Sequence, residues 1–184
     1  MRRIAYAMLV SVVSMAPVMA ESFYTALDVG QSKEKDACTG LPAGTTGCKN
    51  TASMFRLAGG YQFSPMWGAE VSYGDYGRAS CGIQTACEWK VSGVQLAGTG
   101  TFPIASSFSL LGKIGVARTD LKIYGGGGGA ATSTKIAYGI GAQYDFVRNI
   151  SARVQYEDLG NVGDSNTGGS SKVSLLSAGI VYKF

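Results

Sequence analysis

The stretch from Lys135 to Phe146 reads KIAYGIGAQYDF and carries apolar side chains at every second position. The turn VRN follows at 147–149, and residues 150–157, ISARVQYE, resume the same alternation. A period of two is the pattern of a β-strand with one apolar face. Two such runs joined by a short polar turn predict a β-hairpin. This hairpin sets the pattern for the rest of the chain.

The same alternation recurs along the chain and predicts eight strands in total. They are expected at 23–30, 54–63, 69–74, 94–102, 108–119, 135–146, 150–157 and 176–184. Short turns at 64–66, 103–105 and 147–149 alternate with long polar loops at 32–51, 77–88, 125–134 and 163–171. This spacing predicts an all-β, antiparallel up-and-down barrel with every long loop at one end.

One hairpin is used twice in the sequence. Tyr61, Phe63, Ala69, Val71, Tyr73, Asp75 and Gly77 recur 83 residues later as Tyr144, Phe146, Ala152, Val154, Tyr156, Asp158 and Gly160. The second and third strands are therefore expected to match the sixth and seventh.

The two faces of the predicted strands decide between a soluble and a transmembrane barrel. The apolar face has aromatic residues beside the short turns, where a membrane-interface girdle belongs. The opposite face mixes small residues with charges, and an eight-stranded barrel is only wide enough inside for side chains. We therefore expect a transmembrane barrel whose interior holds paired charges. The expected interior charges are Asp28, Arg56, Glu70, Lys113, Asp145, Arg153 and Glu157.

The N-terminus has the layout of a secretory signal. A basic start, Met1-Arg2-Arg3, precedes an apolar run that ends at Pro17, and small residues at Val18 and Ala20 predict cleavage after residue 20. We expect residues 1–20 to be the signal peptide and 21–184 the barrel domain. The exported part has 14 Lys and Arg against 12 Asp and Glu, a net charge of +2, which indicates no nucleic-acid partner.

Four cysteines follow the signal, namely Cys38, Cys48, Cys81 and Cys87. An oxidising compartment favours disulfides, and three pairings are possible. The nearest-neighbour pairing would close two short loops. The chain has no histidine and no CxxC motif, so we expect no metal site, no cofactor and no histidine-dependent catalysis.

The residues 138–146 and 150–160 together resemble the penultimate hairpin of OmpA-like outer-membrane barrels. The chain end also resembles the C-terminal signal that outer-membrane insertion machinery reads, with alternate residues Leu176, Ala178, Ile180, Tyr182 and Phe184. The resemblance covers 21–184 and implies an outer-membrane location and lipid as the surrounding partner. OmpA itself continues into a peptidoglycan-binding domain, so the comparison is with short, barrel-only surface antigens of Gram-negative type.

Several functions fit these features. The leading one is a structural or surface-interaction barrel that meets a ligand through its long loops. The alternative is a small-solute pore, for which alanine at Arg153 or Glu70 should open a conductance if these charges form the plug. A carboxylate enzyme site built from Asp28, Asp145 and Glu157 is a weaker hypothesis, as is a soluble lipocalin-like carrier, which would need an apolar lumen.

Overall fold

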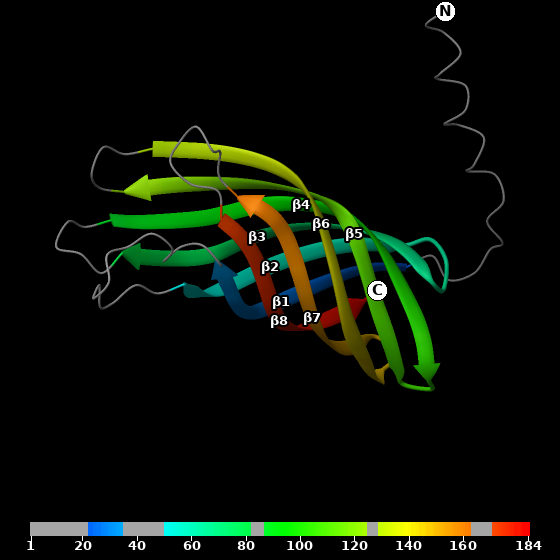
Figure 1. The fold of residues 1–184 in the computed structure, drawn as a ribbon. Coiled ribbons are helices and arrows are strands. Elements are labelled where there is room, and N and C mark those ends of the chain that lie inside the picture. The colour runs from blue at the N-terminus through cyan, green and yellow to red at the C-terminus, as the bar shows by residue number, and fades with distance from the viewer. Residues whose placement is uncertain (1–21, 35–49, 82–86, 125–128, 163–170) are drawn as a thin grey trace, which may run out of the picture.

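The computed structural model describes residues 22–34, 50–81, 87–124, 129–162 and 171–184. These residues form eight antiparallel strands that close into a barrel, with each strand paired to its sequence neighbours and the last paired to the first (Figure 1). The strands are β1 (Ser22–Glu34), β2 (Thr51–Gln62), β3 (Trp67–Cys81), β4 (Cys87–Ala105), β5 (Phe108–Tyr124), β6 (Gly129–Val147), β7 (Ile150–Val162) and β8 (Ser171–Lys183). The predicted fold class and strand number are confirmed. No helix among the described residues is long and apolar enough to cross a membrane.

The alternation in the sequence becomes an alternation of burial along every strand. Large apolar side chains project from the outer wall, as Leu57, Val71 and Ile140 do with more than half of their surface exposed. Polar and small side chains on the opposite face are buried in the lumen. This inside-out arrangement suits a wall in contact with hydrocarbon, because closing the barrel pairs the backbone groups of every strand.

Several loop and turn boundaries differ from the prediction. Strands β3 and β4 run to Cys81 and from Cys87, so part of the expected loop 77–88 is ladder, and β6 begins at Gly129 inside the expected loop 125–134. β1 likewise continues to Glu34 inside the expected loop 32–51, and β7 and β8 reach Val162 and Ser171 at the edges of 163–171. These extensions are polar or small in sequence and lack an apolar face, so alternation did not reveal them.

The turn expected at 103–105 also shifts. β4 continues to Ala105 through an irregularity between Pro103 and Ala105, and the turn is formed by residues 106–107. A proline at the end of a strand removes one ladder hydrogen bond, which fits its place at the bulge.

The repeated hairpin is reproduced in three dimensions. β3 bulges after Asp75 and β7 bulges after Asp158. In each bulge a glycine with positive φ, Gly77 or Gly160, donates its backbone N–H to the aspartate two residues before it. Glycine adopts this conformation without the strain that a side chain would add. Tyr76 and Leu159 are the last inward residues before the phase of the alternation changes, and both are buried in the lumen. Beyond the bulges, Arg78 and Asn161 are exposed at positions that unbroken alternation would have turned inward.

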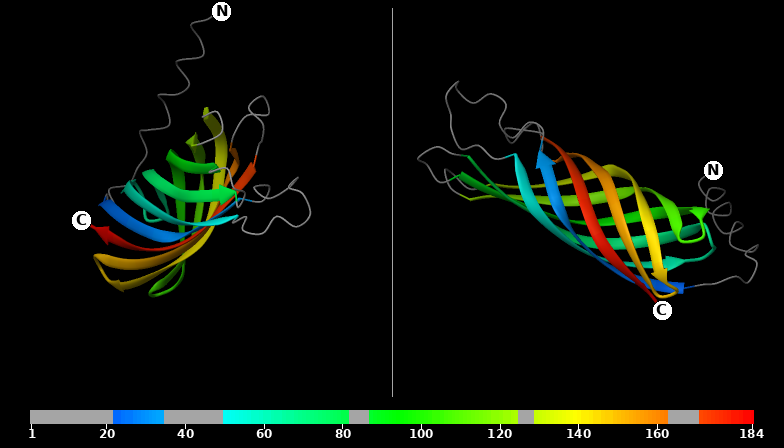
Figure 2. Two further views of the ribbon diagram at one scale, coloured as in Figure 1. Left: turned by 90° about the vertical axis from the view of Figure 1, so that its left-hand side faces the viewer. Right: turned by 90° about the horizontal axis from the view of Figure 1, so that it is seen from below.

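The barrel is longer on one side. β3, β4, β5 and β6 have 15, 19, 17 and 19 residues, whereas the other four strands have 12 or 13. Figure 1 and the right-hand view of Figure 2 show these strands reaching farther at the end opposite the short turns. Short turns lie on the periplasmic side of such barrels, so the extended sheet is on the outer surface of the membrane.

Candidate functional site

The middle of the lumen is filled by charged side chains from five strands. Each occupies an inward-facing position of the two-residue alternation, and each has at most 8% of its surface exposed. The six residues are Asp28 of β1, Arg56 of β2, Glu70 of β3, Lys113 of β5, and Arg153 and Glu157 of β7.

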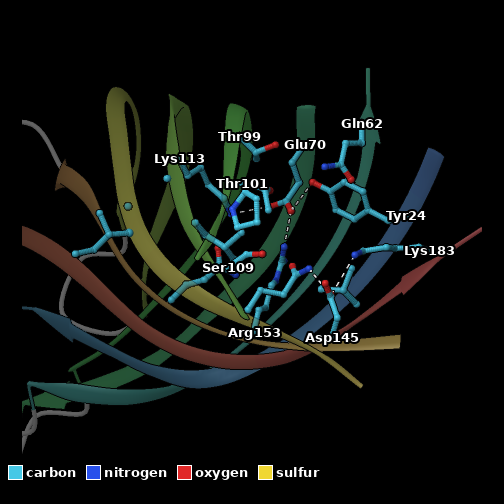
Figure 3. Close-up of a pocket in the computed structure, with 18 of the residues that line it drawn as sticks. Tyr24, Gln62, Glu70, Thr99, Thr101, Ser109, Lys113, Asp145, Arg153 and Lys183 are labelled. Carbon is cyan, nitrogen blue, oxygen red and sulfur yellow. Dashed lines mark hydrogen bonds and ion pairs between the residues drawn. The ribbon is translucent and has the colours of Figure 1, made fainter. Parts of the chain in front are cut away.

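These six side chains form a closed ring in which positive and negative charges alternate. Asp28 accepts from Arg56 Nε at 2.9 Å and from Arg153 Nη2 at 2.7 Å. Glu70 accepts from Arg153 Nη1 and from Lys113 Nζ, each at 2.7 Å (Figure 3). Glu157 completes the ring by pairing with Arg56 and, at 3.5 Å, with Lys113. We call this set the charge ring.

The ring balances three cations with three carboxylates. Burying a charge without a partner is expensive, and breaking a buried pair leaves the remaining charge uncompensated. Arg153 alone makes three hydrogen bonds to the ring, two to Asp28 and one to Glu70. Moving any one of these side chains out of the ring would therefore leave its partners buried and uncompensated, at a large free-energy cost.

Glycines on the inward face make room for the ring. A Cβ on Gly179 would overlap Asp28 Oδ1, and a Cβ on Gly139 would lie 2.5 Å from Glu157 Cγ. The ring of Tyr24, whose hydroxyl donates to Glu70 at 3.1 Å, fills the space over Gly60. The high glycine content of the chain thus serves, at these positions, to admit large charged side chains into a narrow barrel.

An apolar layer lies in the lumen on the outer-surface side of the ring. Its members are buried and come from all the strands except β1. The core residues of this layer are Met54, Tyr76, Val91, Ala117, Ala137, Leu159, Val173 and Leu175, with Leu121 packed against them. The layer excludes water from one side of the charge ring.

A cavity of about 230 Å³ lies on the other side of the ring, toward the short turns. Glu70, Lys113 and Arg153 form part of its wall, together with polar side chains such as Thr99 and Ser109 (Figure 3). The charge ring is therefore bordered by a polar cavity on the periplasmic side and an apolar layer on the outer side.

Asp145 also faces the lumen, where it lines the periplasmic cavity, but it lies apart from the charge ring. It lies at the short-turn end, half-buried, where it pairs with Lys183 at 3.2 Å and accepts from Gln143 at 2.9 Å and from Ser151. The two-residue alternation gives the face of a residue but not its height along the barrel. The seven expected interior charges comprise three cations and four carboxylates. Because Asp145 is not part of the ring, the ring itself has three of each and is neutral.

The other predicted residues lie away from the lumen centre. Cys81 and Cys87 are Cα partners in the β3–β4 ladder, and Cys38, Cys48 and residues 1–20 lie outside the described residues. Leu176, Ala178, Ile180, Tyr182 and Phe184 are all exposed on the outer face of the C-terminal segment. Phe184 donates its N–H to the Phe23 carbonyl at 2.9 Å, and its ring meets Tyr182 edge-on.

The chemistry of the lumen is that of a salt-bridge core. Asp28, Glu70 and Glu157 are each paired with cations, and the part of the chain that the structure describes has no group of three or more His, Cys, Asp or Glu side chains suited to a metal ion. The paired side chains of the charge ring occupy the centre of the lumen.

A family model for the OmpA-like transmembrane domain matches residues 18–184. The chain belongs to this family. Among its relatives, outer membrane protein A of Salmonella typhi is 33% identical over 68% of this chain, and that of Yersinia pseudotuberculosis is 30% identical over 100% of it. The chain spans 38% and 56% of the lengths of these two relatives.

Solved structures show the same fold. Ail, the attachment invasion locus protein of Yersinia pestis, superimposes with a TM-score of 0.61 at 21% identity, over 90% of this chain and all of that one. Neisserial surface protein A gives a TM-score of 0.61 at 20% identity with the same coverage. This OmpA-like barrel is thus an integral protein of the outer membrane, embedded in lipid, and the soluble-carrier hypothesis is wrong.

Sequence reasoning missed two parts of the OmpA-like lumen. The apolar layer depends on Tyr76 and Leu159, which lie just beyond the expected ends of the third and seventh strands and continue the inward face of each. The available signal was the alternation itself, because Tyr76 is two residues after the inward Gly74 and Leu159 is two residues after the inward Glu157. The second omission was Leu111 of β5, an apolar residue that lies in the wall of the periplasmic cavity.

Proposed function

We propose that this OmpA-like barrel acts as a closed scaffold that presents its outer-surface segments to a ligand, with no catalytic activity and no open pore. The segments expected to meet the ligand are 32–51, 77–88, 125–134 and 163–171. The observation that carries the proposal is the closed charge ring, which fills the lumen at mid-height with six mutually paired side chains.

The apolar layer supports the same conclusion independently. An ion crossing from the outer surface would have to pass Tyr76, Leu159 and Leu175, none of which offers it a charge. Moving an ion through an apolar constriction without hydration is costly. Two barriers of different chemistry therefore stand in series.

A non-catalytic role fits the side chains available. The sequence has no histidine. Of the three carboxylates in the hypothetical enzyme site, Asp28 and Glu157 are paired with cations of the charge ring. The third, Asp145, pairs with Lys183 at the short-turn end of the barrel. Ail has been crystallised in complex with the heparin analogue sucrose octasulfate. A barrel of this fold can therefore hold a ligand.

Export and assembly complete the proposal. Residues 1–20 direct export, the alternating C-terminal residues that end in Tyr182 and Phe184 engage the insertion machinery, and disulfides constrain the first two long loops. The outward exposure of Leu176, Ile180, Tyr182 and Phe184 supports this assignment, because a recognition signal has to be accessible before the barrel meets lipid.

The alternative, a small-solute pore, is favoured by the periplasmic cavity, which brings a polar space of about 230 Å³ up to Glu70, Lys113 and Arg153. Single-channel recording separates the two functions. Folded, oxidised protein, shown to be inserted by protease protection of the barrel, is placed in a planar bilayer. Silence supports the closed scaffold. Stable, reproducible openings, absent from bilayers without protein, would overturn it in favour of the pore.

A further inference from the structure

A row of cations crosses the outer wall of the extended sheet. Arg78 of β3 is the Cα partner of Lys90 of β4, and Lys90 is the Cα partner of Lys122 of β5. Cross-strand partners lie on the same face of a sheet. Val91, next to Lys90, is buried in the lumen, so this row is on the outer face. Arg118, four residues before Lys122 and exposed, adds a fourth cation to the same face.

The row is only partly neutralised. Lys90 pairs with Asp75 at 2.7 Å, and Asp120, between Arg118 and Lys122 on β5, accepts a hydrogen bond from Thr132. Among the side chains that the structure describes, which do not include Glu88, no carboxylate lies within ion-pair distance of Arg78, Arg118 or Lys122. Like charges directly opposite each other across strands are destabilising. An anion that bridges these cations would therefore reduce their repulsion and stabilise the row.

The height of the row indicates where that anion lies. On the outer face of β5, the exposed Val116 is followed in phase by Arg118, Asp120 and Lys122. At about 3.3 Å per residue, Lys122 is roughly 20 Å farther along the strand than Val116, and the tilt of a barrel strand makes the rise above the membrane smaller. The cations therefore begin where hydrocarbon contact ends and continue through the headgroup zone.

The direction of the row indicates the kind of partner. The side chains are on the wall of the barrel and face sideways, along the membrane plane, whereas a soluble partner would approach the loops from above. We propose that Arg78, Lys90, Arg118 and Lys122 bind the phosphate groups of a phosphorylated glycolipid headgroup in the outer leaflet. Arginine offers paired N–H donors that match phosphate oxygens, and lysine adds point charges.

The test uses folded protein in mixed micelles, titrated calorimetrically with a bisphosphorylated diglucosamine glycolipid and, separately, with the same glycolipid lacking its phosphates. Each cation near an anionic lipid surface contributes about fivefold in affinity, so the double variant Arg78→Gln/Lys122→Gln should bind the phosphorylated glycolipid about thirtyfold more weakly. The dephosphorylated glycolipid should show no saturable binding to either protein.

A matched control has the same change in net charge elsewhere. Lys33 is exposed on β1, away from the row, and Arg148 is exposed in the short turn between β6 and β7. The double variant Lys33→Gln/Arg148→Gln should bind as the unmodified protein does. Asp75→Asn should act in the opposite direction and tighten binding severalfold, since it frees Lys90 while its amide oxygen can still accept from Gly77.

Three results would overturn the proposal. These are equal losses in the patch and control variants, equal binding of both glycolipids, or displacement of the glycolipid by a soluble sulfated polysaccharide that binds the row more tightly. The last would assign the row to a partner outside the membrane. Retained heat-modifiable gel migration in every variant shows that lost binding is not lost folding.

Discussion

Asp28 extends its carboxylate into the space that a side chain on Gly179 would occupy. The two residues are Cα partners at the seam where β1 and β8 close the barrel. A Cβ at Gly179 would overlap Asp28 Oδ1 and also the Leu27 carbonyl oxygen, and the backbone oxygen cannot move aside without disturbing the ladder. The bare backbone at Gly179 thus links the closure of the barrel to the formation of the charge ring.

Gly179→Ala should therefore destabilise the barrel by about 2 kcal/mol, the usual cost of overpacking a filled interior. Gly112→Ala is the matched control, because a Cβ there meets no atom within 4 Å. Urea titrations of both variants in lipid vesicles, followed by tryptophan fluorescence, measure the difference. Equal stability of the two variants would show that the β1–β8 seam can accommodate a methyl group at position 179.

Removing Arg153 should weaken the barrel without opening it. Arg153→Ala leaves Asp28 and Glu70 without their shared cation, at a cost of about 3–5 kcal/mol. The apolar layer remains, so we expect planar bilayers with this variant to stay silent. This modifies the simpler expectation, drawn from the sequence, that alanine at Arg153 or Glu70 suffices for conductance.

Conductance should appear when Arg153→Ala is combined with Tyr76→Ala and Leu159→Ala, because both barriers are then breached. The double variant Tyr76→Ala/Leu159→Ala, which keeps the ring, should be silent. If Arg153→Ala alone conducts as well as the triple variant, the apolar layer is no barrier.

The ion pair and hydrogen bond of Asp158 at the β7 bulge should stabilise the barrel less at acidic pH than at neutral pH. Asp158 lies beyond Tyr156, the last outward aromatic residue of β7. Partial burial opposes ionisation of Asp158, but the hydrogen bonds from Lys172 and Gly160 outweigh it, so its pKa lies below the ordinary value of 3.8. A carboxyl with a depressed folded-state pKa stabilises the protein above its unfolded pKa, and this contribution is lost as the pH falls through the folded pKa.

Asp158→Asn keeps the acceptor for Gly160 but loses the ion pair with Lys172. The difference in urea midpoint between this variant and the unmodified protein should be largest at neutral pH and should disappear as the pH falls below 3.8. A gap of constant size across the acid range would mean that the ionised carboxylate contributes nothing.

Cys81 and Cys87 should be linked to each other. Facing Cα atoms in an antiparallel pair are about 4.5–5.5 Å apart, within the roughly 4.4–6.8 Å that a disulfide spans. Peptide mapping of the unreduced protein should recover this pair and leave Cys38 with Cys48. A link between either member of the first pair and either member of the second would contradict this expectation.

Loss of the terminal aromatic should impair assembly in cells more than folding in vitro. Phe184→Ala removes a side chain with 71% of its surface exposed, so little packing is lost. The heat-modifiable fraction in outer membranes should fall severalfold, while refolding of purified protein into detergent stays near normal. Phe146→Ala, which removes another exposed aromatic near the short turns, is the control. Equal assembly of both variants in cells would exclude a signal role for Phe184.

The sequence alone predicted the barrel because the lipid and the lumen impose opposite demands on alternate residues. In β6 the large residues Ile136, Tyr138 and Ile140 face the lipid. The small residues between them, Ala137 and Gly139, face the lumen. The charges of the ring were evident for the same reason, since a charged residue in an alternating apolar strand has to face the lumen.

What the alternation did not give is position along the barrel axis. Asp145 and Arg153 alternate identically, yet only Arg153 lies in the ring, because strand tilt and register set the height of a residue. The polar ends of β3 and β6 were also missed. Beyond the hydrocarbon, water satisfies both faces, and no periodic pattern remains to mark the strand.

The duplicated bulges, at Gly77 and Gly160, lie on β3 and β7, four strands apart in a closed set of eight. Strands four apart stand on opposite sides of the barrel, so a half-turn about the lumen brings one bulge onto the position of the other. The chain thus carries an approximate twofold symmetry that a single polypeptide has no need to keep. Symmetry of this kind is what the duplication and fusion of a four-stranded unit would leave behind, with β2–β3 and β6–β7 as its two equivalent hairpins.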